Sequence, residues 1–207
     1  MEYTIDLESD SSTKVRKAAE IIFKKKLEGY CSYLIDALVR EIEKPKAWKT
    51  QCQLIKAIAK TDCTDALPTL KQLVEREYDS TILYKELGFA IFILENTGVG
   101  TLNLDSLYQS IEKGNELQIC GACSGILFKK VIPPSDDIQK IIAGIAQYTE
   151  NEGPKITPRC YIAAVAHLWP KEEVTDFLQS CQKSTWNGLV EISNNALQGK
   201  ESKIQLI

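Results

Sequence analysis

Histidine is nearly missing from the 207-residue chain, which contains only His167. A Ser-His-Asp or Cys-His catalytic arrangement would have to use this residue. It lies in the stretch AAVAHLWP, a small apolar setting that is typical of a packed, hydrogen-bonded histidine. A glycine-rich phosphate loop is missing too, because no Lys-Ser/Thr follows Gly98 and Gly100. We therefore expect a protein that is not an enzyme and needs no cofactor.

Long apolar runs and an excess of positive charge are also missing, and the first residues do not predict a leader segment. No run reaches the ~18 apolar residues of a membrane-spanning helix, and residues 1–12 are acidic, unlike a signal peptide. The chain has 25 Lys and Arg against 28 Asp and Glu, a net charge of −3 that gives a nucleic-acid surface little support. We expect a cytoplasmic protein whose partner is another protein, with no membrane and no small-molecule cofactor.

Cysteine is present in an odd number, seven, and most of the seven occupy apolar positions of helical patterns. Cys120 and Cys123 form a CxxC motif, which can hold zinc or carry out redox chemistry. No second CxxC and no nearby histidine completes such a site. The sequence therefore predicts small buried thiols in a reducing compartment and no metal. The seven are Cys31, Cys52, Cys63, Cys120, Cys123, Cys160 and Cys181.

The strongest pattern in the chain is an internal repeat of apolar triplets at i, i+3 and i+7. This spacing places each triplet on one face of a helix, and the first members of successive triplets lie 34 to 37 residues apart. The triplets are Cys31, Leu34 and Leu38; Leu67, Leu70 and Val74; Leu104, Leu107 and Ile111; Ile138, Ile141 and Ile145; and Val174, Phe177 and Cys181.

A second series of helices alternates with the first at the same period, which is the signature of stacked helical hairpins. Its apolar anchors recur every 35 to 37 residues and are Ala19, Ile55, Ala90, Ile126 and Ala163. Helices are expected at 12–27, 31–43, 47–60, 64–77, 81–95, 102–113, 116–131, 135–149, 157–169, 171–183 and 186–198. The sequence thus predicts an all-α solenoid of about five hairpins plus an N-terminal capping helix. It forms a single domain over 1–207, with repeats at 12–198 between tails at 1–11 and 199–207.

Residues 10–23, DSSTKVRKAAEIIF, carry a short motif in addition to the period. Asp10, Val15, Arg16 and Ala19 match the core motif of HEAT-like repeats, and the chain resembles this armadillo-type family in period over about residues 10–200. Later repeats open without Val-Arg. The resemblance implies a right-handed superhelix whose second helices line a concave face. Such families mostly bind other proteins, and a minority, including HEAT-like DNA glycosylases, act on nucleic acid.

A candidate partner-binding face follows from the helix expected at 47–60. Because Cys52, Ile55 and Ala59 face the core, polar residues on its other side would face the concavity. Such a Lys/Arg–Tyr groove suits an acidic or amphipathic protein segment, although it could be merely a solvated face. The candidate residues are Lys49, Gln53, Lys56 and Lys60, with Tyr84, Lys85, Ser124 and Arg159 as exposed counterparts in later repeats.

Two alternatives to a general scaffold or adaptor remain open. One is an immunity protein that inhibits a cognate toxin, for instance a basic nuclease, through an acidic ridge of loops. The residues of this ridge would be Asp62, Asp65, Glu75, Glu77, Asp79, Glu150, Glu152, Glu172, Glu173 and Asp176. The other is a glycosylase-type enzyme, which would need a basic groove and an acidic residue among aromatics such as Trp48, Trp169 and Trp186.

Overall fold

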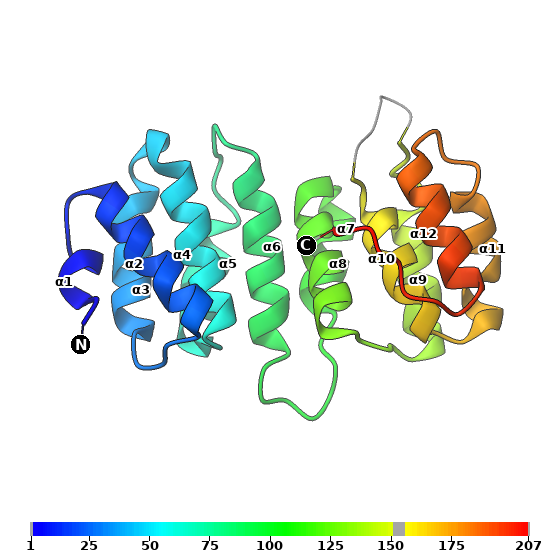
Figure 1. The fold of residues 1–207 in the computed structure, drawn as a ribbon, viewed down its shortest axis with the longest axis horizontal. Helices are drawn as coiled ribbons and strands as arrows, with labels where there is room; N and C mark the ends of the chain where they lie inside the picture. The colour runs from blue at the N-terminus through cyan, green and yellow to red at the C-terminus, as the bar shows by residue number, and fades with distance from the viewer. Residues whose placement is uncertain (1, 151–155, 207) are drawn as a thin grey trace. The chain divides into compact units, whose positions relative to one another are not determined.

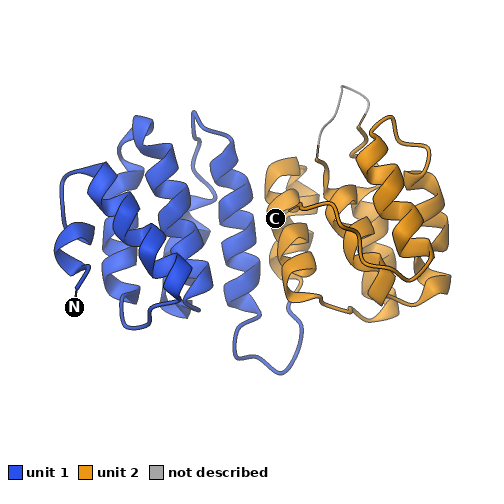
Figure 2. Ribbon diagram, viewed as in Figure 1, with its two compact units in different colours: residues 1–103 blue, residues 104–207 orange. Residues whose placement is uncertain are grey.

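The structure, a computed structural model, describes residues 2–150 and 156–206 and is all-helical (Figure 1). Helix accounts for 68% of it, and the described residues contain no strand. Every helical range expected from the periodicity overlaps an observed helix. The prediction of an all-α fold is therefore confirmed. By their internal contacts, the residues form two compact units, 1–103 and 104–207, which are described separately (Figure 2).

Unit 1 consists of two layers of helices. In one layer α2 packs against α4 and α4 against α6; in the other lie α1, α3 and α5, with α3 on α4 and α5 on α6. The bounds are α1 Thr4–Leu7, α2 Ser12–Lys25, α3 Cys31–Ile42, α4 Trp48–Lys60, α5 Leu67–Leu73 and α6 Ile82–Glu95, with short 3₁₀ helices η1 Pro45–Ala47 and η2 Thr64–Ala66. Consecutive helices thus pair as the hairpins that the repeat predicts.

Helix α1 lies within the segment 1–11 that was expected to be a tail. It buries Leu7, whose side chain is 1% exposed, and packs against α2 and α3. Arg40 of α3 donates a hydrogen bond to the Leu7 carbonyl oxygen. The sequence gives no periodic signal here because a single helical turn is shorter than one repeat of the apolar pattern.

Unit 2 has the same kind of layering. Its helices are α7 Asp105–Lys113, α8 Glu116–Lys129, α9 Ser135–Ile145, α10 Pro158–Val165, α11 Lys171–Cys181 and α12 Asn187–Leu197, with the 3₁₀ helix η3 Ala166–Leu168. Helices α8, α10 and α12 contact one another in that order, and α7 and α11 each pack on the helix that follows. The segment after α12 runs extended back across α12 and α10 to α8 (Figure 1).

The core agrees with the two predicted apolar series. All five anchors of the second series have 0% exposure. In the triplets led by Leu104 and Ile138, every side chain is buried except Ile111, which is half-buried. Leu67 and Val74 are also half-buried; Val74 lies just beyond α5, which is shorter than expected and ends at Leu73. The spacing of apolar residues therefore identified the buried face of each helix.

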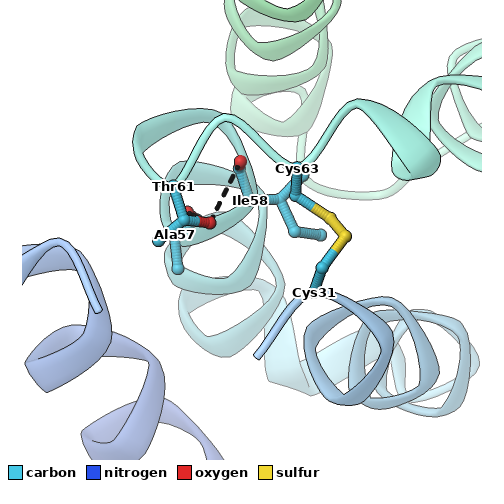
Figure 3. Close-up of a disulfide and its surroundings, with 5 residues drawn as sticks. All are labelled: Cys31, Ala57, Ile58, Thr61 and Cys63. Atoms are coloured by element: carbon cyan, nitrogen blue, oxygen red, sulfur yellow. Dashed lines mark hydrogen bonds between the residues drawn. A yellow bond between two sulfur atoms is a disulfide. The ribbon is translucent and has the colours of Figure 1, made fainter. Parts of the chain in front are cut away.

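A disulfide joins Cys31, the first residue of α3, to Cys63, which follows α4 (Figure 3). The turn that ends α4 fixes the position of Cys63. The Cys63 amide donates a hydrogen bond to the Ile58 carbonyl oxygen, and the Thr61 hydroxyl donates one to the Ala57 carbonyl oxygen. The Cα atoms of the two cysteines are 5.5 Å apart, an ordinary disulfide spacing. The prediction of free thiols is therefore wrong for this pair. The argument for a reducing compartment loses its support, since disulfides persist in oxidising ones.

None of the described helices combines the length and the apolar character that crossing a membrane requires.

Candidate functional site

The residues of the predicted binding row on α4 lie on one face of that helix, but most of them are partly covered within unit 1. Lys49 is exposed, whereas Gln53, Lys56 and Lys60 are half-buried. The Lys56 ammonium lies 3.1 Å from the carboxylate of Glu86 on α6. An ammonium that already has a carboxylate partner offers less to an incoming acidic group. Of the four, Lys49 alone is both exposed and without a described ion pair.

The predicted counterparts in later repeats do not extend this row. Tyr84 of α6 is half-buried, donates its hydroxyl to the Arg76 carbonyl and stacks edge-on against Tyr78. Lys85 is half-buried as well. The expectation that Ser124 and Arg159 are exposed is wrong, because their exposures are 2% and 6%.

Arg159 and Ser124 are buried for different physical reasons. The Ser124 hydroxyl donates back to the Gly121 carbonyl of its own helix, α8. Arg159 lies 3.3 Å from the buried carboxylate of Glu150, which also accepts hydrogen bonds from Thr157 at 2.7 Å and Ser184 at 2.8 Å. This polar cluster connects the segment before α10 to the turn before α12. Neither Arg159 nor Ser124 therefore belongs to the candidate binding surface.

A basic pocket lies instead where the N-terminal ends of α2 and α4 meet. It is an open hollow of about 560 Å³. The hydroxyl of Thr50 on α4 donates to the Ser12 carbonyl of α2 at 3.0 Å and holds the two helix ends together. The positive ends of two helix dipoles therefore border the hollow. Its lining residues are Ser12, Thr13, Arg16, Lys44, Lys46, Ala47, Trp48, Lys49 and Thr50.

The charge around this basic pocket is positive, and three of its four cations lie outside any close ion pair among the described residues. Four of the lining side chains are cationic and none carries a carboxylate. Lys44 is engaged, because its ammonium lies 2.6 Å from the Glu41 carboxylate. Arg16, Lys46 and Lys49 form no ion pair with any described carboxylate. Such a concave cluster of like charges attracts an anionic group.

Trp48 gives the basic pocket an aromatic anchor. Its side chain is 40% exposed, although tryptophan is usually well buried. The ammonium of Lys49 lies 5.3 Å from the centre of the Trp48 ring, which is cation–π distance. Tryptophan and arginine are the residues that most often dominate a protein interface. The pocket can therefore hold both a carboxylate and an apolar group.

Sequence reasoning named Lys49 but missed Arg16, Lys46 and Trp48 as parts of one site. A local signal was present, because KPKAWK at 44–49 places three lysines and a tryptophan around a proline break. Arg16 also lies three positions before the anchor Ala19, and the residues at this position before the later anchors are all uncharged. What the sequence lacks is the approach of residues 12–16 to residues 44–50, which depends on helix packing.

The free cysteines are buried. Burial raises the pKa of the Cys52 thiol to about 12 and of the Cys160 thiol to about 11. Burial likewise raises the pKa of the thiols of Cys123 and Cys181. Neutral thiols are poor nucleophiles. The ring Nδ1 of His167 lies 2.9 Å from the Ala164 carbonyl oxygen, as expected for a packed histidine.

The acidic ridge expected along the loops is reduced in the structure. Asp65, Glu77 and Asp79 are exposed, but Asp62 pairs with Lys26 at 2.9 Å. Glu150 is buried, which corrects its place on the ridge. Glu152 lies outside the described residues. Glu75 is exposed too, as are Glu172 and Asp176 in unit 2, whereas Glu173 is half-buried.

No protein-family model, no curated protein and no solved structure matches the chain. The resemblance to HEAT-like repeats accordingly stays a prediction made from residues 10–23 and from the period.

Proposed function

We propose that the chain is a non-catalytic protein-binding module, built as a HEAT-like α-solenoid, that holds an acidic segment of another protein in the basic pocket of unit 1. The observation that carries the proposal is a set of three cations, none in a close ion pair with a described carboxylate, beside a part-exposed tryptophan. Alternation of two helix series and their pairwise packing within each unit support the solenoid architecture.

An acidic protein segment suits the pocket better than a nucleic-acid backbone. The pocket gathers its cations at one place, whereas a duplex presents a regular line of phosphates that is usually met by a basic stripe. A glycosylase-type site would also need a carboxylate among the aromatics, and none lines the hollow. Trp169 is 4% exposed and donates its ring nitrogen to the Val131 carbonyl, so it is engaged in the core.

Charge reversal in the basic pocket tests this proposal directly. The probe is a fluorescein-labelled octaglutamate peptide, measured by fluorescence anisotropy at about 0.15 M salt. We expect the double variant Lys46→Glu, Lys49→Glu to bind it at least ~10-fold more weakly, since each reversal replaces an attraction with a repulsion. Binding should also change the emission of Trp48, and Trp48→Phe should remove that change.

The matched control is Lys171→Glu, Lys183→Glu, which changes the net charge equally at exposed positions of unit 2. It should bind octaglutamate like the wild type. Equal losses in the two double variants would mean that net charge alone attracts the peptide, and the pocket would be rejected. Tighter binding of a 20-base-pair DNA duplex than of octaglutamate would instead support the nucleic-acid alternative.

The partner itself can be sought with the same pair of proteins. In pull-downs from the native cell, the wild type should capture the protein that binds in the basic pocket. The double variant Lys46→Glu, Lys49→Glu should not capture it. Mass spectrometry identifies it. A basic nuclease retained equally by both would point to the acidic loops, and therefore to the immunity-protein alternative.

A further inference from the structure

The segment after α12 lies in an extended conformation against unit 2. It leaves the end of α12 and crosses α10 to reach α8 (Figure 1). Exposure alternates along it: Glu201, Lys203 and Gln205 are exposed, whereas the side chains between them are half-buried or buried. Leu206 is 7% exposed. This period of two is what an extended chain shows when one face lies on a surface.

The surface beneath the segment is a groove with an apolar wall. Leu127 and Phe128 of α8 and Ala164 of α10 border, together with residues 201–206, a remaining hollow of about 230 Å³. Phe128 is still 45% exposed with the segment in place. The hollow shows that residues 201–206 fill the groove incompletely. An exposed aromatic beside an unfilled apolar hollow is typical of a binding surface.

Few polar contacts hold the segment in this groove. Glu201 pairs with Lys130 at 2.9 Å, but the two side chains are 60% and 55% exposed, so the pair adds little. The Lys200 amide donates to the Asn195 carbonyl and closes α12. Beyond it, no described residue of 201–206 forms a backbone hydrogen bond with a helix. The segment is held mainly by its inward aliphatic side chains.

We propose that this groove is a docking site for an extended segment of a partner protein, and that residues 201–206 occupy it in cis until the partner displaces them. The occupant in the structure defines the chemistry that fits. It has a carboxylate that reaches Lys130, followed by aliphatic side chains at two alternate positions, as in Glu201, Ile204 and Leu206. The groove lies in unit 2 and does not depend on the basic pocket of unit 1.

Competition in cis has a measurable consequence. A tethered segment acts at an effective concentration in the millimolar range. The apparent affinity for a free peptide equals the intrinsic affinity multiplied by the fraction of molecules whose groove is open. A free peptide with the same sequence should therefore bind the intact protein weakly. The same peptide should bind at least ~10-fold more tightly to a full-length variant whose own segment cannot dock.

The test uses the full chain and a fluorescein-labelled peptide, GKESKIQL, that copies residues 199–206. Leu206→Asp should release the segment in cis, because a charge is expelled from an apolar groove. We expect this variant to bind the peptide at least ~10-fold more tightly than the wild type does. Gln205→Asp, which changes the net charge by the same amount at an exposed position, should behave like the wild type. A peptide with its own leucine replaced by aspartate should not bind.

A second variant identifies the groove. Adding Phe128→Asp to Leu206→Asp should abolish peptide binding while circular dichroism stays helical. The proposal is overturned if Leu206→Asp binds the peptide no better than the wild type, or if Phe128→Asp leaves the binding intact. It is equally overturned if Leu206→Asp and the milder Leu206→Ser both fail to fold, since the segment would then be part of the core and not an exchangeable occupant.

Discussion

Replacing Arg159 with alanine will lower the free energy of unfolding by about 3 to 5 kcal/mol, the usual cost of leaving a buried charge without its partner. The side chains of Arg159 and Glu150 are only 8% and 1% exposed, so water cannot solvate the carboxylate that the substitution leaves behind. Hydrogen bonds from Thr157 and Ser184 remain but do not neutralise the charge. Urea denaturation followed by circular dichroism measures the loss.

The matched control for this prediction is Arg76→Ala. Arg76 pairs with Glu43 at 2.8 Å, but the two side chains are 45% and 64% exposed, so the loss should stay below about 1 kcal/mol. Replacing both Glu150 and Arg159 with methionine should cost less than Arg159→Ala alone, because no unpaired charge stays buried. Similar losses for Arg159→Ala and Arg76→Ala would show that the cluster does not carry a buried charge pair.

Removing the disulfide with Cys31→Ala and Cys63→Ala will cost about 3 to 4 kcal/mol. The bond closes a loop with a sequence separation of 32 residues, and the chain-entropy model gives about 3 kcal/mol for 15 residues and about 4.7 for 100. Dithiothreitol should lower the stability of the wild type by a similar amount. It should leave the double variant unchanged, because that variant has no bond to reduce.

Cys52→Ala is the control for the disulfide, since Cys52 is also buried but has a free thiol. This variant should keep the sensitivity to dithiothreitol. A thiol count in denaturant without reductant should find five reactive thiols, the five cysteines outside the bond. Seven reactive thiols, or a wild type whose stability does not change in dithiothreitol, would contradict the disulfide.

Most of the helical framework was predictable because its signal is local. Apolar residues at i, i+3 and i+7 fall on one side of a helix whatever surrounds it, and a repeated hairpin must bury that side against its neighbours. The anchors from Ala19 to Ala163 were therefore identified correctly as core. Helix ends were less certain, as in α5 and α9, because they depend on caps and turns more than on periodicity.

The candidate site was predictable only in part, and its errors share one cause. Lys49 was recognised from its place on α4, but whether Lys56 is free depends on Glu86 of the next helix. Arg159 and Ser124 were expected to be exposed because they occupy the repeat position of the α4 row. Within unit 2, Arg159 has Glu150 and Thr157 around it, and Ser124 is enclosed in the core. Repeat position predicts the direction of a side chain but not what covers it.

Sequence by itself determined the all-helical class, the period of about 36 residues and the face that each helix buries, since all three follow from the order of apolar and polar residues along the chain. Only the tertiary structure decided which distant residues meet. Cys31 bonds to Cys63, residues 12–16 meet 44–50 to form the basic pocket, and residues 201–206 lie on α8. Such pairings depend on how whole helices pack, and no local pattern encodes the identity of a partner that lies thirty or more residues away.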